Sequence, residues 1–344
     1  MTLPALLPDR YPNRDFFIAD IFDNLPFKDD MASMEHPIFT LSKKKDMRNL
    51  EYRNGNVSIN IKPNSDGLPT IFDKDVLLYC GSLMMAEINQ GRIPPKTLRI
   101  SSHDLLIATN RPTSGEGYKL LKKALDRLTG VTIKTNIKTN KREQTEGFHL
   151  IDSYRVVESS RIKDRMIRLE ITMSDWFYNS ILGKEVLTIN REYFQLGKPL
   201  ERRLYEIARK HCGNSSSWDI GLIRLMEKTG SMSTLRLFRS FIKDISGVNH
   251  LPDYLIHFSS DDTVTFTSRG NAVKAQTSLP LNDMPSINAE TIRRGAKIVG
   301  DAATGWDYNA IRSQFTEQIM AGFKPDNVNG AFINFVKKKV ANRP

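Results

Sequence analysis

The chain has 344 residues, of which 40% are hydrophobic and 26% are charged, a composition typical of a folded globular protein of about two domains. Its 50 Lys and Arg residues outnumber its 39 Asp and Glu residues and leave a net charge of +11 at pH 7. This surplus indicates a polyanionic partner, either nucleic acid or an acidic membrane surface. A membrane-spanning helix is excluded because the longest apolar run, Val76 to Ala86, is broken by Gly81 and Ser82 and is much shorter than the roughly 20 residues required.

Signals for secretion, metal binding and catalysis are missing from the sequence. The start MTLPALLPDR lacks a basic region, so we expect no signal peptide. The two cysteines, Cys80 and Cys212, lie far apart in apolar patterns, which favours buried thiols in a reducing, cytoplasmic compartment. The six histidines form no metal-binding motif, and there is no phosphate-binding loop or G-x-S-x-G motif. We therefore expect no enzyme, no metal and no other cofactor.

The N-terminal part of the chain predicts extended structure. Residues 1–32 are rich in Pro, Asp and Asn with isolated aromatic residues, which indicates a mostly extended arm. From Pro37 onward, the short apolar or alternating runs PIFTL, NVSINIK and PTIF predict strands. The turns between them are predicted at Asn54-Gly55 and Asp66-Gly67.

Helical patterns begin at Asp73, which we expect to cap the segment DKDVLLYCGSLMMAEINQG. A short strand, TLRI, precedes a helix capped by Ser101 or Ser102, and GEGYKLLKKALDRLTG predicts an amphipathic helix ending at Gly130. The strands VTIKTNI, GFHLIDSYRVVE and RMIRLEITM follow. This order is typical of a winged helix-turn-helix, with the basic segment after Gly130 as its wing.

The same order recurs downstream. Three helical segments, PLERRLYEIARKHCG, WDIGLIRLMEKTG and STLRLFRSFIKDISG, are followed by a hairpin of YLIHF and TVTFT. Residues 120–131 match residues 237–248 at a constant offset of 117, with nearly all apolar positions shared, and both copies end in Thr/Ser-Gly-Val. This is an internal repeat.

The fold class predicted from these patterns is α+β, with tandem winged-helix domains. We expect an extended arm at 1–32, a first winged-helix domain at 33–195 and a second at 196–272. The polar composition beyond Arg269 predicts a linker, and residues 273–344 as a whole predict that linker and a small C-terminal helical segment.

The third helix of the second copy presents two contrasting faces. The apolar stripe that we expect to be buried contains Phe238, Phe241, Ile242 and Ile245. A second face carries the candidate base-reading residues Arg236, Arg239, Ser240 and Lys243. An arginine fork suits guanine O6 and N7 in the major groove. Ser233 and Thr234 are candidates to cap the helix and to bring its backbone N–H groups to a phosphate.

The first copy carries a more basic surface that predicts phosphate contacts rather than base reading, with Leu121, Ala124, Leu125 and Leu128 as its buried stripe. The candidates are Lys119, Lys122, Lys123, Arg127, Lys134, Lys138, Lys141 and Arg142. Each of these residues taken alone also fits a solvated helix face. On the preceding helix of the second copy, Arg202, Arg203, Arg209 and Lys210 fit solvation and phosphate contact equally well. Asp261 and Asp262 are expected to form a turn.

Several long segments resemble the plasmid replication initiator protein A (RepA) family of bacteria. They are DIFDNLPFKDDMASMEHPIFTLSKKKDMRNLEYRNG, DKDVLLYCGSLMMAEINQG, GEGYKLLKKALDRLTGVTIKTNI and LGKPLERRLYEIARKHCG, in this order within residues 18–270. More loosely, the tail NGAFINFVKKK is also similar. Asp126, which stands where the second copy has Lys243, departs from a base-reading pattern in the first copy.

The resemblance implies an initiator of plasmid DNA replication that binds repeated origin sites (iterons) through tandem winged helices, with the recognition helix at Ser233 to Ile245. It further implies a monomer that binds iterons, a homodimer that represses its own gene and controls plasmid copy number, and host helicase, helicase loader and initiator protein as partners. A transcriptional repressor without initiation activity fits the same residues. An RNA-binding or membrane-surface protein fits the charge but not the repeat.

Overall fold

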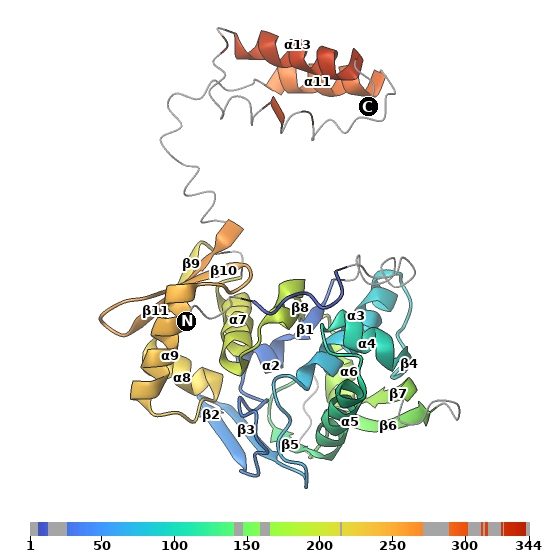
Figure 1. The fold of residues 1–344 in the computed structure, drawn as a ribbon, viewed down its shortest axis with the longest axis vertical. Coiled ribbons are helices and arrows are strands. Elements are labelled where there is room, and N and C mark those ends of the chain that lie inside the picture. Colours follow the sequence, from blue (N-terminus) through green and yellow to red (C-terminus); the bar gives the residue numbers. More distant parts are fainter. Residues whose placement is uncertain are drawn as a thin grey trace. The chain divides into compact units, whose positions relative to one another are not determined.

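The computed structural model describes residues 6–12, 26–140, 147–158, 166–213, 215–270 and 289–301, together with 311, 314–315, 325 and 327–341. The chain divides into two compact units, residues 1–274 and 275–344. The first unit combines helices with small antiparallel sheets (Figure 1), so the predicted α+β class is confirmed.

The first repeat contains three helices and a three-stranded sheet. Its elements are α3 (Lys74–Asn89), β4 (Thr97–Ser101), α4 (Ser102–Ala108), α5 (Gly115–Gly130), β6 (Ile151–Glu158) and β7 (Met166–Met173). Strand β7 lies between β4 and β6 and pairs antiparallel with both. Ser101 caps α4 by accepting a hydrogen bond from the backbone N–H of Asp104, as predicted.

The second repeat has the same order of elements. They are α7 (Pro199–His211), β9 (Ser217–Gly221), α8 (Leu222–Thr229), α9 (Leu235–Val248), β10 (Tyr254–Phe258) and β11 (Thr263–Ser268). Here the last strand, β11, lies between β9 and β10, as β7 lies between β4 and β6. The sequence repeat therefore coincides with a repeat of helix order and of strand order.

The remaining elements of the first unit lie outside the two repeats. They are β1 (Lys28–Asp30), α2 (Met31–Glu35), β2 (Leu50–Asn54), β3 (Val57–Lys62), β5 (Thr132–Thr135), α6 (Asp175–Leu182), β8 (Val186–Thr188) and the 3₁₀ helix η1 (Arg191–Gln195). Figure 1 shows the repeats on either side of α2 and β1. The mostly extended structure predicted for the arm fits Lys28–Asp30, which form β1, whereas its last two residues, Met31 and Ala32, begin α2. Phe27, Asp29 and Asp30 are buried, so this end of the arm is part of the packed interior. Residues 13–25 of that arm lie outside the described residues.

Strand β5 corrects the predicted wing of the first repeat. It pairs with β3 in the β2–β3–β5 sheet and not with the hairpin of its own repeat, which is formed by β6 and β7. The predicted strands PIFTL and PTIF are also wrong, since Thr40 and Thr70 form only an isolated parallel bridge. Both segments supply side chains to the core without joining a sheet, and Ile38, Phe39 and Ile71 are buried there.

One hydrophobic core runs from Phe27 to Phe266 through both repeats. The predicted apolar stripe of α5 is buried: Leu121, Ala124, Leu125 and Leu128. In α9 the stripe consists of Phe238, Ile242 and Ile245, whereas Phe241 is 39% exposed. Phe241 lines an open groove beside Met232 and Leu200, so its assignment to the buried stripe was wrong.

The second unit contains two described helices, α11 (Ala289–Asp301) and α13 (Val328–Ala341). They have a hydrophobic core of their own that includes Val299, Phe315, Phe332 and Val336. Helices were predicted in this part of the chain. The predicted linker at residues 271–288 lies outside the described residues.

Candidate nucleic-acid interface

Helix α9 exposes a row of polar and basic side chains. Thr234 caps the helix, because its hydroxyl accepts a hydrogen bond from the backbone N–H of Leu237 at 3.3 Å. Arg236, Ser240 and Lys243 are all exposed, at the i, i+4 and i+7 positions that place side chains on one face. The opposite face is buried, so this row is fixed toward solvent by the packing of α9.

Arg239 lies at the edge of this row and has a protein partner. Its Nε donates a hydrogen bond of 2.8 Å to Oδ1 of Asp262, and its Nη2 donates to Oδ2 of the same carboxylate. The hydrogen bond from Arg239 lowers the pKa of Asp262, and the charges of Arg239 and Lys243 act in the same direction. Asp262 is therefore held as an anion beside two of the predicted base-reading residues.

Ser233 and Thr234 have different surroundings at the start of α9. Thr234 is exposed, whereas Ser233 is partly buried and its hydroxyl shares a hydrogen bond of 2.9 Å with that of Ser231. The capping part of the prediction is thus confirmed for Thr234 only.

Helix α5 presents its lysines to solvent. Lys119, Lys122 and Lys123 are exposed, while the carboxylate of Asp126 accepts a hydrogen bond from the hydroxyl of Tyr154 on β6. Burial raises the pKa of Tyr154, and the hydrogen bond and charge of Asp126 add to this shift. Asp126 therefore has a structural partner on the sheet, which explains the acid in this copy.

Arg127 does not fit the predicted DNA contact. Its Nε and Nη2 bind the two carboxylate oxygens of Asp73 at 2.7 and 2.8 Å, and its side chain is only 16% exposed. Oδ2 of Asp73 also accepts a hydrogen bond from the backbone N–H of Thr70, and Asp73 makes no side-chain cap bond to α3. Because Arg127 is both paired with Asp73 and largely buried, the prediction for it is corrected to a structural ion pair.

The remaining basic candidates of the first copy lie on or after β5. Lys134 on β5 and Lys138 beyond it are exposed, but β5 pairs with β3 in the β2–β3–β5 sheet. They are therefore not side chains of the β6–β7 hairpin. Lys141 and Arg142 lie outside the described residues.

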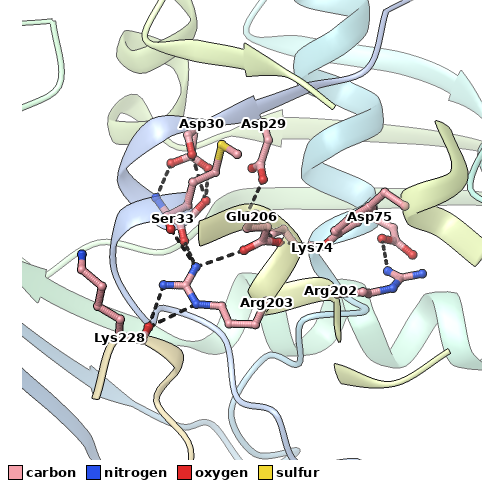
Figure 2. A network of polar contacts seen from close by, with 11 residues as sticks. Asp29, Asp30, Ser33, Lys74, Asp75, Arg202, Arg203, Glu206 and Lys228 are labelled. Carbon is pink, nitrogen blue, oxygen red and sulfur yellow. Dashed lines mark hydrogen bonds and ion pairs between the residues drawn. The ribbon is translucent and has the colours of Figure 1, made fainter. Parts of the chain in front are cut away.

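For two arginines of α7, the structure contradicts both interpretations given above, solvation and phosphate contact. Arg202 and Arg203 are neither solvated nor available to a phosphate, because each is about 3% exposed or less. Arg202 Nη1 binds Oδ1 of Asp75 at 2.6 Å (Figure 2). Arg203 Nη1 binds Oε2 of Glu206 at 3.0 Å and the backbone oxygen of Ser33 at 2.7 Å.

A buried lysine completes this network. Lys74 on α3 lies between Oδ2 of Asp29 on β1, at 2.8 Å, and Oε1 of Glu206 on α7, at 3.0 Å. Figure 2 shows these side chains converging from β1, α2, α3 and α7. Burial raises the pKa of Asp29 well above its usual range, although Lys74 opposes that shift. The network joins the first helix of the second repeat to α2 and α3, and its function is structural.

Three further observations concern the cysteines, membrane spans and metal sites. Both cysteines are free and buried, as predicted. Within the ranges that the structure describes, no helix has the length and apolarity to cross a membrane, and no group of three or more His, Cys, Asp or Glu side chains is arranged to hold a metal ion.

Comparisons with solved structures give similarities to domains 2 and 3 of RctB. One such structure has 12% sequence identity and a TM-score of 0.47, and it covers 68% of this chain and 94% of its own. A second has 14% identity and a TM-score of 0.42, and it covers 69% and 97% of the two chains.

Sequence comparisons give a more specific result. A protein of Wigglesworthia glossinidia brevipalpis, provisionally named as a replication protein, is 41% identical over 259 residues, which is 74% of this chain and 94% of the relative. The family model described as Replication initiator protein A matches residues 28–256, which include every element from β1 to α9 and the first part of β10. The chain therefore belongs to the Replication initiator protein A family.

Proposed function

We propose that this protein starts plasmid replication by binding repeated origin sequences (iterons) as a sequence-specific duplex DNA-binding protein in the bacterial cytoplasm. The observation that carries the proposal is the row of Arg236, Ser240 and Lys243 on the outward face of α9, in a chain of the replication initiator family. A helix with this face presents donors to base edges and to phosphates at once. The protein acts by binding and has no catalytic step of its own.

The two repeats are proposed to be winged helices. Each has the order helix, strand, helix, helix, strand, strand, and in each the last strand lies in the middle of its sheet. In this assignment α9 enters the major groove and the β10–β11 hairpin is the wing beside it. Helix α5 is the equivalent element of the first repeat, with the β6–β7 hairpin as its wing.

The proposal is tested by fluorescence anisotropy on duplexes that tile the DNA around the protein's own gene, with nonspecific competitor present. We expect tight binding that resists competitor and is confined to a set of direct repeats. Weak binding to every duplex, lost as salt rises, would contradict sequence-specific recognition.

Replacing Arg239 by alanine is expected to weaken binding to the cognate repeat by about 1–3 kcal/mol and to relax the preference at one base pair. The reason is the loss of an arginine fork beside the exposed row of α9. Arg99→Ala is the control, because this exposed arginine on β4 lies outside the row. An Arg239→Ala protein with the selectivity of the wild type would remove Arg239 from the recognition surface.

Replacing Lys119, Lys122 and Lys123 together by alanine is expected to weaken binding to all sequences alike. Each phosphate contact that is lost should make the slope of log K against log salt shallower by about 0.9. Lys337→Ala with Lys338→Ala, two exposed lysines on α13 beyond the family match, is the control. An unchanged slope in the triple variant would place α5 outside the DNA footprint.

Initiation and regulation form the second part of the proposal. Several copies bound to iterons strain an A·T-rich duplex until it opens, and host helicase, helicase loader and initiator protein are recruited there.

A homodimer in equilibrium with the monomer represses the gene and limits copy number. Sedimentation velocity with and without origin DNA tests the equilibrium, and a single species under all conditions would contradict it. An origin-dependent plasmid maintenance assay separates an initiator from a repressor.

A further inference from the structure

The turn between β10 and β11 contains two adjacent carboxylates with different partners. Asp261 is a turn former, as predicted: its Oδ2 accepts a hydrogen bond of 3.0 Å from the hydroxyl of Thr263, and its Oδ1 accepts one from Ser259. Asp262 instead directs its carboxylate to Arg239 on α9, 23 positions earlier in the chain. The second acid therefore connects the hairpin to the helix.

The backbone holds Asp262 in a fixed position. Its φ of 60° lies in the left-handed region, and its carbonyl oxygen accepts a hydrogen bond of 2.8 Å from the backbone N–H of Leu222 at the start of α8. The next residue, Thr263, pairs with Gly221 on β9. The carboxylate is thus anchored by the hairpin, by β9 and by α8 before it reaches Arg239.

The geometry of the pair leaves part of the arginine fork open. The carboxylate binds the guanidinium along its Nε and Nη2 edge. A guanidinium has five N–H donors, so Nη1 and the second hydrogen of Nη2 remain outside this pair and form the adjacent edge. That edge has the spacing for the O6 and N7 acceptors of a guanine. Because the pair fixes a long side chain, less rotamer freedom is lost when DNA binds.

We propose that Asp262 is a positioning residue that determines sequence specificity, because it holds Arg239 with its free guanidinium edge toward the major groove. The inference rests on the proposed function and adds to it a residue that has the same sign of charge as the DNA. Asp262 favours the cognate site through Arg239, and its negative charge disfavours binding to phosphates in general. Both effects raise the ratio of cognate to nonspecific affinity.

The test compares Asp262→Asn with Asp244→Asn by competition binding to cognate and scrambled duplexes. Asparagine tolerates the left-handed backbone of residue 262, so the turn is retained while the charge and the two-oxygen acceptor are lost. We expect the ratio of cognate to nonspecific affinity to fall about three- to tenfold. Asp244 is an exposed acid on α9, and its substitution should raise both affinities together with no change in the ratio.

A second comparison separates positioning from damage to the hairpin. In an Arg239→Ala background, Asp262→Asn should leave the ratio unchanged, because the group that it positions is gone. An equal loss in both backgrounds, or an Asp262→Asn protein that behaves like Asp244→Asn, would overturn the positioning role. A wild-type protein that does not discriminate between the duplexes would instead overturn the proposed function, and this inference with it.

Discussion

Replacing Lys74 by methionine is expected to lower the free energy of unfolding by about 3–5 kcal/mol at pH 7, as measured by urea denaturation. The variant leaves the carboxylates of Asp29 and Glu206 buried without the ammonium group that lies between them. Arg203 still binds Glu206, but Oδ1 of Asp29 already has no hydrogen-bond partner among the described residues. In the variant, Asp29 is therefore the carboxylate whose charge is most costly to bury.

Two comparisons check the origin of this loss. The deficit of Lys74→Met should shrink as pH falls, because a buried carboxyl with a raised pKa takes up a proton and no longer carries charge. Adding Asp29→Asn should restore part of the stability for the same reason. Lys62→Met, at an exposed lysine on β3, is the control and should change stability little. A loss below about 1 kcal/mol for Lys74→Met would contradict the structural importance of the network.

The second large effect concerns pH and His36, the residue that follows α2. His36 is 8% exposed, and its Nδ1 has no hydrogen-bond partner within the described part of the chain. Burial lowers the pKa of this imidazole from 6.5 to about 4, and the nearby positive charges of Lys228 and Arg203 act in the same direction, against Glu35. The folded protein thus keeps His36 neutral in a range where the unfolded chain protonates it.

Stability should therefore fall as pH decreases from 6.5 to about 4, and the contribution of His36 should be complete above pH 6.5. The gap between these two pKa values corresponds to about 3 kcal/mol. The carboxylate of Asp46 affects stability in a lower pH range, because the hydrogen bond from Arg48 lowers the pKa of Asp46 from 3.8 to about 2. Glu35 behaves similarly, since hydrogen bonds from His211 and Lys228 outweigh its burial and lower its pKa.

The measurement is the free energy of unfolding of wild type and His36→Gln between pH 7.5 and pH 4.5. The difference between the two proteins should change across this range, because glutamine does not titrate there. His257→Gln, at an exposed histidine on β10, is the control for a histidine outside the core. A constant difference between wild type and His36→Gln would show that His36 is not kept neutral by the fold.

Periodicity in the sequence was sufficient to predict most of the scaffold. The buried positions of α5, and those of α9 apart from Phe241, follow from the 3.6-residue period of helices. The exposed row on α9 follows from the same period. The repeat follows from the match of residues 120–131 to residues 237–248. Strand pairing was harder to predict. The sequence of β5 has nothing that separates it from a strand of the following hairpin, and only the tertiary structure selects β3 as its partner.

The errors in the site concern charged residues whose partners are distant in sequence. Arg127 meets Asp73 across 54 positions, and Arg202 meets Asp75 across 127. No local sequence pattern distinguishes such an arginine from one that binds a phosphate. Asp262 was missed for the same reason, because a turn explains it without reference to α9. Arg203 and Glu206 are an exception, because they lie three positions apart on one face of α7 and pair there.

The core that continues through both repeats has a consequence for the DNA layout that the proposed function requires. Helices α5 and α9 belong to one compact unit, so in the proposed binding mode they would meet a duplex with a set separation along its axis and a set rotation about it. One base pair added between the two contacted stretches turns one against the other by about 35°. An origin repeat that keeps every contacted base but changes their spacing would no longer be in phase with the protein. In the proposed binding mode, the spacing between the contacted bases is therefore recognised together with their identity.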